Sequence, residues 1–150
     1  MSTPAQPEAP TFRPQVIPSL MVQAVEPLRD FYIGKLGFEH MMGIVGKDGA
    51  FDFCIVTRDG NGVMIGRPEK PEAAVSLQSN VPRSLELYIY VENVDRYHAE
   101  ITGRGVAVVD ALQTQWWGDR TFAVKDPYGY QIWFCQPTGE FSPPEGVKVI

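Results

Sequence analysis

The sequence predicts an α+β domain built from two βαβββ modules. In each half of the chain, one stretch of helical periodicity lies between strand-like runs, in the order strand, helix and three strands. The halves also match in register when shifted by 69 residues, as in Val22/Val91, Val25/Val94 and Gly34/Gly103. A module of this kind cannot cover its own apolar face, so we expect it to pack on the other module or on a second chain, as a homodimer.

The first module is expected over residues 15–66. A strand is predicted at 15–23 and a helix at 25–36, with Leu28, Phe31, Tyr32 and Leu36 on one stripe and Gly37 at the end. Strands are predicted at 38–45, 50–57 and 63–66. The last two are joined by the Asp-Gly-Asn-Gly turn at 59–62, which is typical of a hairpin.

The second module is expected over residues 84–137. It opens with a strand at 84–92, and Asn93 then caps a helix that runs through about Arg104. Strands follow at 106–113, 119–125 and 130–136. Residues 67–83 contain three prolines and are predicted to be a linker between the modules. Residues 1–14 contain four prolines and form an expected flexible leader, and 138–150 form a tail with apolar residues that could pack on a partner.

Composition narrows the class of partner and the compartment. The net charge of −5 without a basic run argues against nucleic acid as a partner. The chain shows no signal peptide, and no apolar run approaches the roughly 18 residues of a membrane helix. Cys54 and Cys135 lie in strand-like runs without metal spacing, which predicts buried thiols in a reducing compartment. A cytoplasmic protein that does not bind a membrane is therefore expected.

Two motifs resemble the vicinal-oxygen-chelate superfamily, which includes glyoxalase I, extradiol dioxygenases, and fosfomycin- and bleomycin-resistance proteins. They are Val22-x2-Val25-x2-Leu28-x2-Phe31-Tyr32 with Leu36-Gly37-Phe38, and Trp117-Gly118-Asp119-Arg120-Thr121-Phe122 leading into Asp126-Pro127-Tyr128-Gly129. The resemblance covers about residues 15–137. It implies the glyoxalase/bleomycin-resistance/dioxygenase fold, in which curved mixed sheets surround a cleft. It implies little about activity, because one fold hosts many chemistries.

The resemblance also places four metal-ligand positions on this chain, at Ile17, Gly66, Glu86 and Trp133. Only Glu86 of these could bind a metal, whereas a catalytic metal needs about three protein ligands. The chain has two histidines. His98 is interpreted as a half-buried packing residue on the second helix. His40 is a strand-edge residue or a hydrogen-bonding group that faces the ligand. No metal and no other cofactor are expected.

Strand alternation predicts which side chains line the cleft. If Glu86 faces inward, Tyr88 and Tyr90 do so too, and Trp133 is accompanied by Gln131 and Cys135, while Trp117 lies at the mouth. The predicted ligand-binding residues are Ser19, Met21, Glu86, Tyr88, Tyr90, Trp117, Gln131 and Trp133. Such a lining is typical of a site for a flat, partly apolar small molecule with hydrogen-bonding or basic groups.

Several interpretations stay open from the sequence alone. The aromatic residues could fill the core, and Glu86 could form a buried salt bridge with Arg120. For function, the leading hypothesis is a metal-free binding protein like the bleomycin-resistance branch, sequestering a drug or metabolite. The second is an enzyme, a glyoxalase-like lyase or isomerase or a dioxygenase, with Glu86 as a catalytic general base. The third is a scaffolding dimer with a vestigial cleft.

Overall fold

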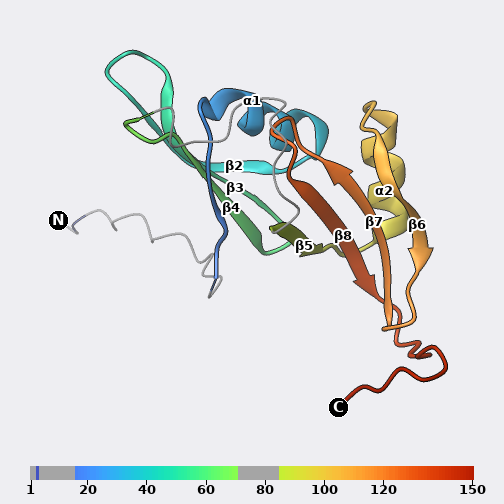
Figure 1. The fold of residues 1–150 in the computed structure, drawn as a ribbon. Helices are drawn as coiled ribbons and strands as arrows, with labels where there is room; N and C mark the ends of the chain where they lie inside the picture. Colours follow the sequence, from blue (N-terminus) through green and yellow to red (C-terminus); the bar gives the residue numbers. More distant parts are fainter. Residues whose placement is uncertain (1–2, 4–15, 71–84) are drawn as a thin grey trace.

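The computed structural model describes residue 3 and residues 16–70 and 85–150. Within them the chain forms two βαβββ modules side by side (Figure 1), so the predicted fold class is confirmed. Parts of the expected leader, at 1–2 and 4–14, and of the expected linker, at 71–83, lie outside the described residues. The elements are β1 (Ser19–Met21), α1 (Val25–Asp30), the π-helix η1 (Phe31–Lys35), β2 (Glu39–Val45), β3 (Phe51–Arg58), β4 (Asn61–Gly66), β5 (Glu86–Tyr90), α2 (Val94–Gly103), β6 (Val108–Thr114), β7 (Asp119–Lys125) and β8 (Gln131–Pro137).

Each module contributes one four-stranded mixed sheet, and the two sheets have the same topology. Their strand orders are β1-β4-β3-β2 and β5-β8-β7-β6. The first strand of each module pairs parallel with the last, and the other pairs are antiparallel. The internal repeat seen at a 69-residue shift is therefore a repeat of topology as well as of sequence.

Two elements of the first module differ from their predicted form. The predicted helix at 25–36 becomes a π-helix after Asp30, in which the Leu36 N–H donates to the Phe31 carbonyl at 3.0 Å. An apolar stripe does not distinguish this wider turn from an α-helical one, because one wide turn keeps the stripe on the same face. The first strand is only Ser19–Met21, since Pro18 has no N–H with which to extend the ladder.

The second helix agrees with its sequence signals. The Asn93 side chain accepts the Arg96 N–H at 3.0 Å, which confirms the predicted N-cap. His98 is half-buried, and its ring meets the Phe122 ring edge-on with centroids 5.0 Å apart, as expected of a packing residue. His40 is exposed, and its Nδ1 accepts from Arg29 Nε at 3.4 Å.

The core lies between each sheet and its own helix. Cys54 belongs to the core of the first module, and Cys135 is buried in the second; both thiols are free, as predicted. Alternation along the predicted strand at 84–92 would place Leu85 on the helix side with Leu87, but Leu85 is 46% exposed, because the β5 ladder begins only at Glu86. The strand residues buried against the helices are Leu20, Cys54, Val56, Val63 and Ile65 in the first module, and Leu87, Ile89, Phe122, Val124, Ile132 and Phe134 in the second.

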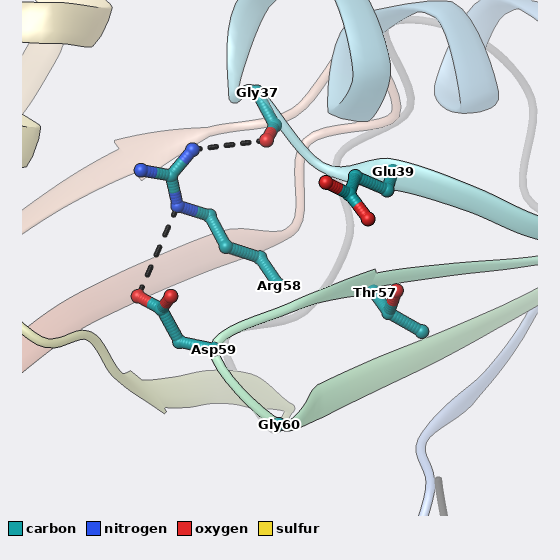
Figure 2. A pocket seen from close by; sticks show the side chains of 6 residues that line it. All are labelled: Gly37, Glu39, Thr57, Arg58, Asp59 and Gly60. Carbon is teal, nitrogen blue, oxygen red and sulfur yellow. Dashed lines mark hydrogen bonds and ion pairs between the residues drawn. The ribbon is translucent and has the colours of Figure 1, made fainter. Parts of the chain in front are cut away.

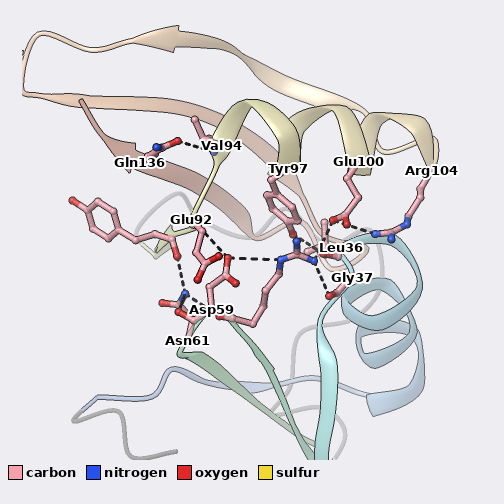
Figure 3. A network of polar contacts seen from close by, with 12 residues as sticks. Leu36, Gly37, Asp59, Asn61, Glu92, Val94, Tyr97, Glu100, Arg104 and Gln136 are labelled. Carbon is pink, nitrogen blue, oxygen red and sulfur yellow. Dashed lines mark hydrogen bonds and ion pairs between the residues drawn. The ribbon is translucent and has the colours of Figure 1, made fainter. Parts of the chain in front are cut away.

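The modules of one chain pack on each other at the end of η1, against α2 (Figure 3). The Tyr97 hydroxyl donates to the Leu36 carbonyl at 2.6 Å in a buried position. The Arg58 guanidinium lies over the Tyr97 ring at 4.4 Å, donates to the Gly37 carbonyl at 2.9 Å and pairs with Glu100 at 3.1 Å. This contact lies on the helical sides of the modules. On the other face of each sheet, Met21 and Tyr88 are 42% and 43% exposed among the described residues.

Replacing Tyr97 with Phe should lower the free energy of unfolding by about 1–2 kcal/mol, because the buried Leu36 carbonyl loses its donor. Urea unfolding followed by tryptophan fluorescence measures this difference. Tyr130→Phe is the matched control, because the Tyr130 hydroxyl makes no hydrogen bond with the described residues. An equal loss in both variants would contradict a special role for the Tyr97 hydroxyl.

Candidate functional site

The open face of the second sheet, opposite α2, gathers most of the predicted site residues. Along β5, Leu87 and Ile89 are buried, whereas Tyr88 and Tyr90 are 43% and 47% exposed. The parallel register pairs β5 with β8 so that side chains on this face are neighbours. The paired residues are Glu86 with Gln131, Tyr88 with Trp133, and Tyr90 with Cys135.

Glu86 and Trp133 contact each other directly. The Trp133 Nε1–H donates to Glu86 Oε2 at 3.0 Å, and Glu86 is exposed. The alternative prediction of a buried salt bridge between Glu86 and Arg120 is wrong, because Glu86 is exposed and Arg120 pairs with another carboxylate. Arg120 Nε instead donates to both oxygens of Asp95, at 3.1 and 3.2 Å. Alternation along β7 explains this, since Arg120 shares the helix side of the sheet with buried Phe122.

Asp119 is a member of the site that the sequence analysis did not assign. It is 8% exposed, and its Oδ2 accepts the Tyr88 hydroxyl at 2.6 Å and the Tyr90 hydroxyl at 3.0 Å. Asp119 begins β7 and shares the open face with Thr121. Counting alternation back from Thr121 would have placed it on this face, but not within reach of two tyrosines on β5.

Desolvation keeps the hydroxyls of Tyr88 and Tyr90 and the thiol of Cys135 protonated. Desolvation, followed by the hydrogen bond to Asp119, raises the pKa of both Tyr88 and Tyr90 above the usual range. Burial also raises the pKa of Cys135 to about 12. At neutral pH the tyrosines are therefore neutral donors and the thiol is protonated, which makes Cys135 a poor nucleophile.

Trp117, predicted to lie at the mouth of the cleft, contacts Tyr88. Its side chain is 39% exposed, and its Nε1–H donates to the Tyr88 hydroxyl oxygen at 3.1 Å. The neighbouring Trp116 ring meets the Trp117 ring edge-on at a centroid distance of 5.6 Å and also contacts the Phe141 ring. We call the surface formed by Glu86, Tyr88, Tyr90, Trp117, Asp119 and Trp133 the aromatic face.

The hydrogen-bond directions give the aromatic face a defined polarity. A tyrosine hydroxyl and an indole each have one hydrogen to donate. Both tyrosine hydrogens go to Asp119, and the two indole hydrogens go to Tyr88 and Glu86. The two hydroxyls and the two indoles therefore have no hydrogen left to donate, and the aromatic face offers an incoming molecule only acceptor lone pairs. This favours a ligand that carries hydrogen-bond donors or a positive charge. Lys125 lies at the margin of this face, opposite Gln131.

Ser19 and Met21 lie on a different sheet. By register they share the open face of the first sheet, where Met21 is 42% exposed. Among the described residues, no recorded hydrogen bond or ring contact joins Ser19 or Met21 to the aromatic face. The open face of the first sheet is rich in methionine and other apolar residues, namely Met21, Met42, Ile44, Phe53, Ile55 and Met64.

A polar cavity of about 430 Å³ lies near the module junction and includes none of the predicted site residues (Figure 2). Its lining is Gly37, Glu39, Thr57, Arg58, Asp59 and Gly60. Arg58 points across it, bonded to the Gly37 carbonyl and 3.9 Å from Asp59. Because its guanidinium also pairs with Glu100 and covers Tyr97, this arginine holds the modules together.

The residues at the implied metal positions do not fit a metal centre. Gly66 lies opposite Met21 and Trp133 lies opposite Tyr88, and neither supplies a ligand atom. Glu86 already accepts the Trp133 indole. Within 16–70 and 85–150, no three His, Cys, Asp or Glu side chains converge on one point.

In the same ranges, no helix has the length and apolarity needed to cross a membrane.

Comparison with known proteins identifies the family. A model of the Glyoxalase/Bleomycin resistance protein/Dioxygenase superfamily matches residues 15–134. The chain belongs to this superfamily. It is also 29% identical over 132 residues to uncharacterised proteins of Mycobacterium bovis and Mycobacterium tuberculosis. The match covers 85% of this chain and 86% and 76% of those proteins, respectively.

Solved structures show the same fold. TioX from Micromonospora sp. ML1 superimposes with a TM-score of 0.66 at 20% identity, over 83% of this chain and 99% of TioX. TnmS3, an antibiotic binding protein from Streptomyces sp. CB03234, is 28% identical with a TM-score of 0.59, over 81% and 93% of the two chains. A glyoxalase/bleomycin resistance protein from the same organism is 27% identical with a TM-score of 0.58, over 80% and 97%.

Proposed function

We propose that the protein binds and sequesters a flat aromatic small molecule that carries hydrogen-bond donors or positive charge, without a metal. The observation that carries this proposal is that aromatic side chains surround two carboxylates, Asp119 and Glu86. The oxygen atoms of these carboxylates accept hydrogen bonds and do not donate them. Rings stack on aromatic side chains, and cations are attracted to their faces. The 28% identity to an antibiotic binding protein supports a small-molecule ligand.

The proposal includes a homodimer that completes the cleft. Within residues 16–70 and 85–150, the apolar open face of the first sheet keeps exposed side chains, and Ile44 on it is 50% exposed. Exposed apolar patches of this kind favour association, most often with two-fold symmetry. If the first sheet of one copy covers the aromatic face of the other, Ser19 and Met21 join Gln131 around the ligand. The two free, buried thiols support a cytoplasmic location as part of the same proposal.

Introducing charge on the open face of the first sheet should separate the dimer. Ile44→Glu is expected to give a monomer in sedimentation equilibrium at concentrations where the unchanged protein is a dimer, because the interface would bury an unpaired carboxylate. Ala99→Glu is the matched control, since Ala99 is exposed on the outer side of α2. A dimer that persists in Ile44→Glu, or a monomeric unchanged protein, would contradict the proposed arrangement.

Three dyes of similar shape and different charge test the ligand class. Proflavine is a cationic acridine, acridone is an uncharged compound with the same three fused rings, and anthraquinone-2-sulfonate is a tricyclic anion. In calorimetric titrations we expect the affinity to fall in that order. Trp133→Leu should weaken proflavine binding roughly twofold to tenfold through loss of stacking. His98→Leu removes a ring of α2 that packs on the opposite side of the same sheet, against Phe122, and should leave the affinity unchanged. Equal binding of cation and anion, or no binding at all, would count against the proposal.

No specific observation favours the catalytic or scaffolding alternatives. A general base must reach a substrate proton. Glu86 is exposed, and one of its oxygens accepts the Trp133 indole. The aromatic face therefore supports ligand binding more directly than it supports catalysis or scaffolding.

A further inference from the structure

The beginning of the C-terminal tail packs on the loop that carries Trp117, within the same chain. The Thr138 N–H and hydroxyl both donate to the Gly118 carbonyl, at 2.7 and 3.1 Å. The Ser142 N–H donates to the Trp116 carbonyl at 2.8 Å. The Phe141 ring meets the Trp116 ring at a centroid distance of 6.1 Å. The tail, which the sequence suggested could pack on a partner, thus binds the backbone on both sides of Trp117.

The loop itself has few other anchors. Its own backbone bonds join Gln115 N to the Asp119 carbonyl at 2.7 Å and Gly118 N to the Gln115 carbonyl at 3.3 Å. Gly118 has a φ of 100°, and a Cβ there would lie 3.6 Å from the Glu140 carbonyl oxygen. The tail therefore follows the loop closely. Its hydrogen bonds to the Trp116 and Gly118 carbonyls restrict the movement of the residue between them.

We propose that residues 138–142 are a positioning element that holds Trp117 beside Tyr88 in the aromatic face, and that Phe141 is its side-chain positioning residue through the Trp116 ring. The tail donates hydrogen bonds to the Trp116 and Gly118 carbonyls. Trp117 Nε1 in turn donates to the Tyr88 hydroxyl, which donates to Asp119. A side chain held in its bound arrangement loses less entropy when a ligand stacks on it. This inference rests on the proposed ligand-binding function for its consequence, and on the contacts of the described residues for its geometry.

The position of Trp117 can be measured without any ligand. In a proton–nitrogen correlation spectrum, the Trp117 indole signal, assigned through Trp117→Phe, should shift and broaden in Phe141→Ala and in a chain ending at Gly139. Phe141→Tyr should restore it. The Trp133 indole signal is an internal control, because the Trp133 Nε1–H donates to Glu86 and not to a residue of the tail. A chain ending at Gly146 is the matched truncation, since it removes the exposed Val149 and Ile150 and keeps the contacts to the loop.

Dye binding then tests the consequence for the site. The proflavine dissociation rate should rise roughly threefold to tenfold in Phe141→Ala and in the chain ending at Gly139, and stay unchanged in the chain ending at Gly146. An unchanged Trp117 signal in the two altered chains overturns the inference, whether or not a dye binds. Failure of the full chain to bind any dye counts against the proposed function alone, and a shifted Trp117 signal still supports the positioning role. Dye binding with equal rates in all chains overturns the consequence for the ligand.

Discussion

Replacing Asp126 with Asn should remove a fall in stability of about 2–3 kcal/mol that the unchanged protein shows as the pH rises from about 4 to about 6. Asp126 is 5% exposed at the turn between β7 and β8. Its Oδ1 accepts the N–H groups of Tyr128 and Tyr130 at 2.8 and 3.0 Å. Its Oδ2 is buried and has no hydrogen-bond partner among the described residues.

The sign of this effect follows from the pKa. Burial raises the pKa of Asp126 from 3.8 to about 6, although three backbone N–H groups oppose the rise. Between these values the folded protein keeps the proton and the unfolded chain releases it. The free energy of unfolding therefore falls with rising pH in this window, and the whole of this decrease has taken place above about pH 6. Asparagine is neutral at every pH and retains an Oδ1 acceptor, so its variant lacks this slope.

Urea unfolding at one protein concentration, repeated across the window, measures the difference between the two proteins. Asp48→Asn provides a control of opposite sign. A hydrogen bond from Arg67 lowers the pKa of the exposed Asp48, so its contribution is lost as the pH falls. Its removal should leave the slope above pH 4 intact. Parallel stability curves for the unchanged protein and Asp126→Asn would show that burial does not raise this pKa.

The sequence predicted the local pattern of the site well, because a strand alternates with a fixed period. Alternation puts Tyr88 and Tyr90 on the same face as Glu86, and the buried Leu87 and Ile89 lie on the other face. The same rule placed Trp133 beside them after β8 was recognised. The internal repeat strengthened these predictions, since each module independently required a strand, a helix and three strands.

The rest depended on distances that a single sequence does not contain. Asp119 was visible only as part of a family motif, because its role comes from the reach of two tyrosines across the register of β5, β8 and β7. The tail was visible only as an apolar segment, and its contact with Trp116 depends on the path of the chain after β8. Ser19 and Met21 share the expected alternation but lie on the other sheet, so their part in the cleft depends on a second copy.

Replacing Asp119 with Ala should weaken proflavine binding by roughly tenfold to a hundredfold, the largest loss expected at the aromatic face. The variant removes a carboxylate that could accept from a cationic ligand, and hydrogen bonds to charged groups are worth about 1.5–3 kcal/mol. It also leaves the Tyr88 and Tyr90 hydroxyls without their shared acceptor. Their hydrogens can then point toward the ligand, so anthraquinone-2-sulfonate should bind better than it does to the unchanged protein.

Two matched variants separate the causes of this change. Asp95→Ala removes the same charge on the opposite side of the second sheet, where Asp95 pairs with Arg120, so its dye affinities should match those of the unchanged protein. Asp119→Asn keeps an acceptor for the tyrosines but removes the charge. If the negative charge attracts the ligand, Asp119→Asn should lose proflavine affinity without gaining affinity for the anion. If Asp119 acts by orienting the tyrosines, the Asn variant should retain the selectivity that Ala loses. Unaltered selectivity in both variants would mean that Asp119 does not determine which ligands the aromatic face accepts.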